Sequence, residues 1–375
     1  MIMRGDTSGP KTEELLRAYF LRAGFFVVRG VPLAYDGEDL TDVDLLLYER
    51  PTGATRRIEV VDIKYRQRPK AIERLFWTRG LVEALNVDGG YVATPDSRPL
   101  LRSIASRLGL VVIDGADQKR IRESHSVLFP ERLSDEELVA LMANVDRQRK
   151  DQRLVNGRKE ILSSLANGFG PSSAVYALGK FSKMAEMAAT AHPGSESAAA
   201  AGRLAYLAAA VACAALDYIS VGGAFRSIEE RRELLSKAVR YGAADTVEGT
   251  RALRLAMSLV EKYAQGGSAA ARHIEKRFKA DLDAIPAEIV ADQASRLLKD
   301  AQLFNVAKEL EAACYNRACP PFDSLAPSEK SMVGALLDYA AVSRKAFASA
   351  WPSTSNEATQ PQQQAVRGGP LPLFK

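Results

Sequence analysis

Hydrophobic and polar residues follow a mixture of helical and strand-like spacings over roughly the first 120 positions of the chain. Residues 13–23 place apolar side chains at helical spacing, and Gly24 ends that pattern. Short runs rich in β-branched and aromatic residues then predict strands, the first closed by Gly30 and Pro32. These predicted strands cover residues 25–28, 43–48, 57–65, 90–94 and 110–113.

Turns and helices connect these runs in an order that restricts the fold. The turn-forming residues 50–53 separate the second and third strands, which predicts a hairpin. Further helices are expected at 69–83 and 99–108, between the later strands. The sequence therefore predicts an α/β domain over residues 1–120, in which a mixed central sheet is flanked by helices.

Beyond about residue 120 the strand-like runs disappear, and Ala, Leu, Arg and Glu recur at helical spacing. We expect an all-helical domain over residues 121–351, and no repeat period in it indicates a solenoid. Residues 352–375 are rich in Ser, Gln, Gly and Pro, so we expect a disordered tail. The predicted helices cover residues 134–165, 171–191, 195–219, 226–264, 268–300 and 302–347.

Composition narrows the class of protein. Hydrophobic residues make up 47% of the 375-residue chain and charged residues 26%, and the mean hydropathy is -0.14, as in a soluble protein. The most apolar stretch, residues 204–216, is shorter than the roughly 20 residues of a membrane span, so we expect a buried helix. Acidic residues near the N-terminus argue against a signal peptide, and the three cysteines form no zinc-binding pattern. We expect a cytoplasmic protein with no membrane partner.

Positive charge is concentrated in one segment of a chain whose net charge is +5. Between residues 64 and 79 a single acidic residue, Glu73, stands among six basic ones: Lys64, Arg66, Arg68, Lys70, Arg74 and Arg79. Such a run is commonly a solvated helix face. Phe76 and Trp77, in the same segment, are expected to be core residues of that helix rather than platforms on which bases stack.

Three charged residues in the predicted hairpin point to metal chemistry. Asp62 and Lys64 are two positions apart and therefore share one strand face, while Asp44 lies in the preceding strand. Charged residues between apolar runs are costly unless they pair or bind a metal. Two carboxylates and the backbone carbonyl of Ile63 suit a hard cation such as Mg²⁺. Lys64 would orient the attacking water and stabilise charge on a phosphate.

With Asp44 followed by Asp62, Ile63 and Lys64 on the next strand, the segment 11–117 resembles the PD-(D/E)XK nucleases, and within them the Mrr-like restriction endonuclease domains. In those domains a glutamate in the first helix belongs to the site, and Glu13 stands at that position, with Glu14 as the alternative. Residues 112–116 resemble the turn after the last strand of those domains. Val43 replaces the proline that names the motif, and Asp42 is the alternative to Asp44.

The resemblance implies an endonuclease that uses Mg²⁺ or Mn²⁺ to hydrolyse phosphodiester bonds, with DNA as the expected partner. Within that framework the catalytic residues would be Asp44, Asp62, Lys64 and Glu13, and the metal ligands Asp44, Asp62 and Ile63. Arg66, Arg68 and Lys70 would contact phosphates on either side of the scissile bond. Such domains serve in restriction, repair or defence against phage, and the residues do not choose among these roles.

Two other functions remain open at this point. A nuclease-like fold can bind nucleic acid or protein without cutting nucleic acid. Alternatively, the protein is an assembly protein whose function lies in the helical domain, which would join copies of the chain or bind another protein. In the least functional interpretation, Asp62 and Lys64 form an exposed ion pair on an edge strand. No P-loop, dinucleotide fingerprint or nucleophile elbow is present.

Overall fold

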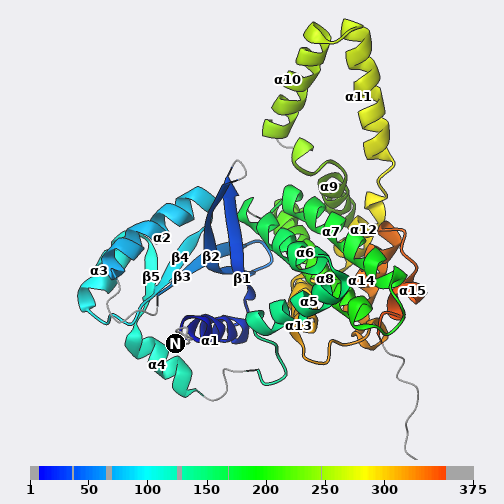
Figure 1. Ribbon diagram of the computed structural model, residues 1–375. Helices are drawn as coiled ribbons and strands as arrows, with labels where there is room; N and C mark the ends of the chain where they lie inside the picture. The colour runs from blue at the N-terminus through cyan, green and yellow to red at the C-terminus, as the bar shows by residue number, and fades with distance from the viewer. Residues whose placement is uncertain are drawn as a thin grey trace, which may run out of the picture.

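The structure is a computed structural model that describes residues 8–35, 38–64, 70–124, 129–167, 169–245 and 247–351. Its N-terminal region contains a five-stranded sheet with helices on both faces (Figure 1). The elements follow the predicted order, with one further helix at the end. They are α1 (Ser8–Arg22), β1 (Phe26–Tyr35), β2 (Glu38–Glu49), β3 (Arg57–Ile63), α2 (Ala71–Leu85), β4 (Gly89–Ala93), α3 (Pro99–Arg107), β5 (Leu110–Ile113) and α4 (Gly115–Glu123).

The sheet is mixed, as the sequence predicts, and its strands lie side by side in chain order. β1, β2 and β3 are antiparallel neighbours, and the register of the β2–β3 hairpin pairs Leu45 with Val61. β3, β4 and β5 run parallel, which requires the crossover helices α2 and α3 between them. The hairpin that carries both halves of the acidic motif is thereby held in the middle of the sheet.

The prediction that Gly30 and Pro32 close the first strand is wrong, because β1 continues to Tyr35. Gly30 adopts a φ of +64°, which a glycine accommodates without strain inside the strand. Pro32 is tolerated because β1 lies at the edge of the sheet, where a missing N–H leaves no neighbour unpaired. The turn expected at 112–116 leads directly into α4, whose N-terminus is capped by the side chain of Asp114.

All five strands of the described residues lie between Phe26 and Ile113, and the region that follows is mostly helical. Several predicted helices are divided: Lys150 in the left-handed conformation, Gly242 and Pro286 each mark a break. The α-helices of this region are α5 (Asp135–Arg149), α6 (Arg153–Ser163), α7 (Pro171–Thr190), α8 (Glu196–Ile219), α9 (Ile228–Tyr241), α10 (Val247–Tyr263), α11 (Gly267–Asp283), α12 (Ala287–Arg296), α13 (Gln302–Tyr315), α14 (Pro327–Tyr339) and α15 (Arg344–Ala348).

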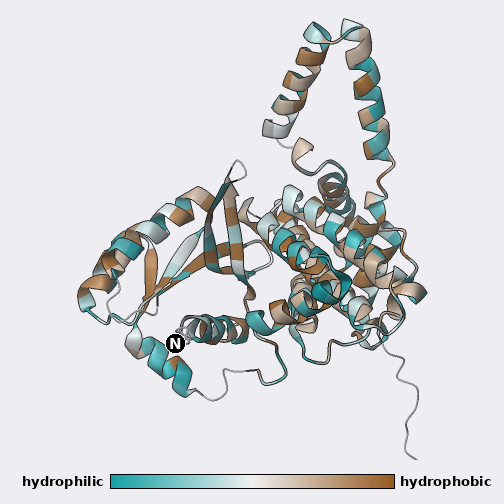
Figure 2. Ribbon diagram, viewed as in Figure 1, coloured by the Kyte–Doolittle hydropathy of each residue, from teal (hydrophilic) through white to brown (hydrophobic). Residues whose placement is uncertain are grey.

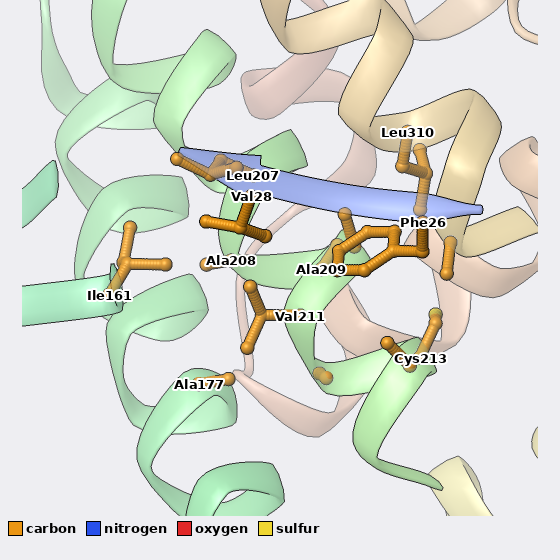
Figure 3. Close-up of a cluster of buried hydrophobic side chains, with 14 of the residues drawn as sticks. Phe26, Val28, Ile161, Ala177, Leu207, Ala208, Ala209, Val211, Cys213 and Leu310 are labelled. Atoms are coloured by element: carbon orange, nitrogen blue, oxygen red, sulfur yellow. The ribbon is translucent and has the colours of Figure 1, made fainter. Parts of the chain in front are cut away.

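One hydrophobic core joins the sheet to the helical region. Figure 3 shows Phe26 and Val28 of β1 beside Leu207 and Val211 of α8 and Leu310 of α13. Removing a buried aromatic such as Phe26 costs about 3–5 kcal/mol, so this contact is a large part of the stability of a domain. The predicted boundary near residue 120 separates sheet from helices, but the core extends across it.

Helix α8 forms the centre of that core. Residues 204–216 are buried throughout, which confirms the prediction of a buried helix. By length and composition the segment Glu196–Gly223 could cross a membrane, but 83% of its apolar window is covered by the rest of the protein. This burial is that of a core helix and is consistent with a soluble protein.

Buried charge also links the two regions. Asp217 of α8 is fully buried, and its carboxylate accepts a 2.6 Å hydrogen bond from the Tyr48 hydroxyl of β2. Arg50 and Arg56 pair with the same carboxylate at 2.8 Å each. An ion pair buried this deeply fixes relative placement, because removing one partner leaves an uncompensated charge.

Candidate active site

The two motif aspartates lie at the end of the β2–β3 hairpin, where the strands begin to separate. The last paired residues are Leu45 and Val61, and the same register places Asp44 opposite Asp62. Directly opposed residues of antiparallel strands project from the same face of the sheet. Both carboxylates therefore share one face.

Asp44 is a half-buried carboxylate with an unusual environment. Its Oδ2 accepts a 2.6 Å hydrogen bond from the backbone N–H of Ile63. Burial raises the pKa of Asp44 to about 6, and the neighbouring carboxylates of Asp62 and Glu13 add to that effect, while the Ile63 N–H and the Lys64 charge oppose it. Within the described residues, no cationic side chain forms an ion pair with Asp44 within 4 Å. Among those residues its carboxylate therefore lacks the paired cation that Asp62 has.

Asp62, by contrast, has two cationic neighbours. The Lys64 Nζ lies 3.7 Å from its Oδ1, and the Arg74 Nε of α2 donates a 2.9 Å hydrogen bond to its Oδ2. A second guanidinium nitrogen of Arg74 contacts Oδ1, so the pair is bidentate. The Asp62 side chain is 10% exposed and β3 is an interior strand, so the ion pair is not the exposed, edge-strand pair of the least functional interpretation.

Arg74 was part of the basic run in the sequence but was not predicted to be a site residue. Its side chain reaches back from the first turn of α2 to the end of β3. Its guanidinium also lies 5.3 Å from the ring centroid of Trp77, one helical turn later. A basic residue three to four positions after a helix start, following an acidic strand end, is the signal from which this contact could have been anticipated.

The structure separates the two candidate glutamates of the first helix. Glu13 pairs with Arg29 of β1 and lies close enough to Asp44 to affect its pKa. Glu14 also pairs with Arg29, and it accepts a hydrogen bond from the backbone N–H of Asp135 in the helical region. Glu14 therefore belongs to the contact between the two regions, whereas Glu13 raises the pKa of Asp44.

Asp42, the alternative to Asp44, lies away from the proposed site. It is exposed, and its strand position is opposite Pro32 on the outer strand rather than opposite β3. The pairing of β2 with β3 does not bring Asp42 opposite Asp62. Of the two aspartates, Asp44 is the one that the hairpin brings to Asp62.

Ile63 anchors the site through its side chain and its backbone N–H. The side chain is buried beneath the sheet among Leu16, Phe20 and Leu45. The N–H donates to Asp44, and the next amide, that of Lys64, donates a 2.8 Å hydrogen bond to the carbonyl of Ala93. These bonds fix the backbone between the two motif residues. The role of the Ile63 carbonyl as a ligand remains a prediction.

The nucleic-acid-binding residues predicted from the sequence fall mainly in a segment that is not described. Arg66 and Arg68 lie outside the described residues. Lys70 is exposed immediately before α2 and pairs with Glu73 at 3.2 Å. Exposure of this kind permits a phosphate contact without requiring one.

The expectation that Phe76 and Trp77 are core residues is wrong. Phe76 is 60% and Trp77 47% exposed, because the buried face of α2 is formed instead by Leu75, Thr78 and Val82. The period of that face places positions 76 and 77 toward solvent. Two exposed aromatic rings thus lie within one turn of Arg74.

A basic groove in the helical region was also not predicted. It has a volume of about 900 Å³ and runs between α6 and α7. Its basic side chains come from helix faces distant in the sequence, so no motif marks it; they are Arg149, Arg153, Lys180 and Lys183. Lys180 pairs with Glu160 in the same groove.

The donor set at the hairpin fits a hard cation in chemistry but is not gathered into a complete cluster. Two carboxylates on one face, one of them with a raised pKa, are the oxygen donors that Mg²⁺ prefers. Within the described ranges, no group of three or more His, Cys, Asp or Glu side chains is arranged to hold a metal ion. Binding would therefore require Arg74 to share or release Asp62.

No family model matches this chain, and no curated protein or solved structure matches it significantly. The PD-(D/E)XK resemblance thus rests on the motif residues, the glutamate of the first helix and the turn at 112–116.

Proposed function

We propose that this protein is a nuclease that uses Mg²⁺ or Mn²⁺ to hydrolyse phosphodiester bonds, with DNA as its substrate and a restriction-endonuclease-like fold in its N-terminal region. One observation carries the proposal: Asp44 and Asp62 are opposed on one face, and Asp44 is half-buried with a pKa raised to about 6. A carboxylate held this way is stabilised by a divalent cation, which would relieve both its burial and its repulsion from Asp62.

The proposed roles follow from position. Asp44, Asp62 and the carbonyl of Ile63 are the ligands, and Glu13, whose charge raises the pKa of Asp44, adds negative charge to the site. The bound cation would supply Lewis-acid polarisation of the phosphate and a more acidic water. Lys64, one third exposed, is free to turn from Asp62 to a phosphate oxygen or to the attacking water.

The proposed contacts with DNA come from the basic segment and the helix that follow Lys64 in the chain. Arg66, Arg68 and Lys70 would bind phosphates, a contribution that does not depend on base sequence. Trp77 and Phe76 would lie against unstacked bases, because exposed aromatic rings next to a basic side chain are a common platform for them. By the resemblance, we assign the protein to restriction, repair or defence against phage in the cytoplasm.

The non-catalytic alternative also has a specific observation in its favour. Asp62 is paired with both Arg74 and Lys64, as it would be in a fold that only binds nucleic acid. The described residues also lack a preformed cluster of three ligands. In this alternative the same face binds DNA through its cations and rings and does not cut.

A substrate panel decides between the two functions. Purified full-length protein is incubated with duplex, single-stranded and branched DNA and with RNA, in Mg²⁺, in Mn²⁺ and in EDTA. We expect metal-dependent internal cleavage of at least one DNA form. Binding without cleavage under every condition, together with no divalent-metal binding in calorimetry, would establish the non-catalytic alternative.

A further inference from the structure

Helices α10 and α11 form a hairpin that projects away from the rest of the protein (Figure 1). Each helix has 17 residues, which corresponds to a length of about 25 Å. Outside its own two helices the hairpin packs mainly on α9 and on the short turn Gly242–Asp245. No residue of α11 is buried. The arm is therefore attached at its base and unsupported along its length.

Helix α10 carries two apolar faces, although it has one helical neighbour along its length. Leu253, Met257 and Val260 are half-buried, as expected for the face turned toward α11. At 100° per residue, the residues Leu255, Leu259 and Tyr263 lie roughly 120° around the helix from that face. They are 61%, 49% and 72% exposed.

The uncovered apolar surface of the arm is comparable to the largest patch on a typical monomer. Figure 2 shows hydrophobic residues on both helices of the arm, and the exposed face of α10 is extended by the exposed Ala252 and Ala256. On α11, Ile274 and Phe278 remain more than one third exposed. At about 150–200 Å² for a fully exposed large side chain, the exposed apolar area of these five large residues is roughly 400–500 Å². That is within the range of the largest patch on a typical monomer.

We propose that this arm is a self-association surface, and that two copies of the chain join by packing their α10–α11 hairpins into a four-helix bundle. The occupant of the exposed face is thus a second copy. Since apolar atoms supply a little over half of a typical interface, this apolar area and its polar margin correspond to roughly 800 Å² per partner, the size of a stable interface. A hairpin with one closed seam and one open apolar face is half of a four-helix bundle.

A second copy fits this face for reasons of length and symmetry. It supplies helices of the same 17-residue length and an apolar face of the same width, as a two-fold interface requires. The arm projects clear of the sheet, so two arms can approach without a clash between their cores. The proposal does not depend on nuclease activity.

Sedimentation of the full-length chain over a range of micromolar concentrations tests the proposal, with two double variants and one control. L255E/L259E places two negative charges on the exposed face. L255S/L259S makes the same face polar without adding charge. Both are expected to weaken dimerisation at least 100-fold with unchanged helical circular dichroism, because these side chains are exposed in the monomer. R254E makes the same change in net charge on the polar face of α10 and should stay within threefold of the wild type.

A wild-type protein that remains monomeric at 50 µM, or a dimer that survives both double variants, overturns the proposal. The arm also carries Arg251, Arg254 and Lys262, so its other candidate occupant is an anionic membrane surface. Flotation with phosphatidylglycerol vesicles separates the two. Monomeric protein that floats with these vesicles, and loses that property in L255S/L259S, would assign the face to lipid and refute self-association.

Discussion

The guanidinium of Arg74 lies against the carboxylate of Asp62, with its Nε 2.9 Å from Oδ2. This contact links the first turn of α2 to the end of β3 and holds one proposed metal ligand on a cation of the protein itself. Arg74 is 26% exposed, so the contact can open toward solvent. Under the proposed function, a divalent metal and Arg74 would therefore compete for the same carboxylate.

Replacing Arg74 with Ala should release Asp62 and raise the affinity for Mn²⁺ about tenfold, a change of about 1.4 kcal/mol. The metal-free variant should also unfold more easily, by about 1–3 kcal/mol, because Asp62 loses its bidentate partner. Calorimetric titration of Mn²⁺ and thermal unfolding measure the two effects. Arg79→Ala, which removes an exposed pair with Glu83 on the same helix, is the control and should change neither. Unchanged or weaker Mn²⁺ binding by Arg74→Ala would exclude the competition.

Asp44 should make the metal-free protein less stable as the pH rises. The pKa of Asp44 is about 6 in the folded protein, and that of an unfolded aspartate is about 3.9. The folded state therefore holds its proton more tightly, and stability is lost between about pH 4 and pH 7. Asp44→Asn removes this loss and should stabilise the protein by up to about 3 kcal/mol at pH 7.5 in EDTA, with little gain at pH 4.

The measurement for Asp44 is urea unfolding at several pH values, and its control is Asp42→Asn. Asp42 is exposed, so that variant should be neutral at every pH. Adding Mn²⁺ should stabilise the wild type but not Asp44→Asn. An equal effect of the two substitutions would show that burial does not single out Asp44.

Trp77 should report on nucleic acid directly. It is 47% exposed, whereas Trp351 is 5% exposed, so single-stranded DNA added in EDTA should quench the emission of Trp77. In Trp77→Phe the remaining emission, from Trp351, should be unaffected. Trp77→Ala should weaken binding about tenfold, within the range of about 1–3 kcal/mol for stacking one base. If Trp77→Ala binds DNA with the affinity of the wild type, Trp77 does not stack on a base.

Asp217→Asn should destabilise the whole protein by about 3–5 kcal/mol, because Arg50 and Arg56 would be left buried without a charged partner. The loss should appear equally in tryptophan fluorescence and in helical circular dichroism, since one core spans the sheet and the helices. Asp323→Asn, which breaks an exposed pair with Lys330, should cost less than about 1 kcal/mol. Two separated transitions in the wild type would contradict a shared core.

The order of elements in the N-terminal region could be predicted from the sequence because its strands are short apolar runs bounded by turn residues. Strand β5 was placed at 110–113, where the structure has it. The end of β1 was misjudged because a proline is excluded from interior strands but tolerated at an edge, and edge position is a tertiary property. The division of the long helical stretches depended on single residues such as Lys150.

The candidate site was predictable where chain-local rules apply and not where contacts are long-range. Alternation within a strand places Asp62 and Lys64 on one face, and hairpin pairing brings Asp44 to them. The contact of Arg74 with Asp62, the pairing of Glu13 and Glu14 with Arg29, and the exposure of Trp77 all depend on how helices dock on the sheet. Such docking cannot be predicted from local sequence patterns.

Single-turnover cleavage of DNA by site variants, with metal affinity measured in parallel, tests the central claim most directly. Asp44→Asn and Asp62→Asn should each lose about 1000-fold in rate, equivalent to about 4 kcal/mol, together with Mn²⁺ affinity. Lys64→Ala should lose a similar factor while keeping its metal, and Asp42→Asn should stay within about threefold of the wild type. If the wild type cleaves and Asp44→Asn or Asp62→Asn cleaves equally fast, the assignment of the metal site to this hairpin is wrong.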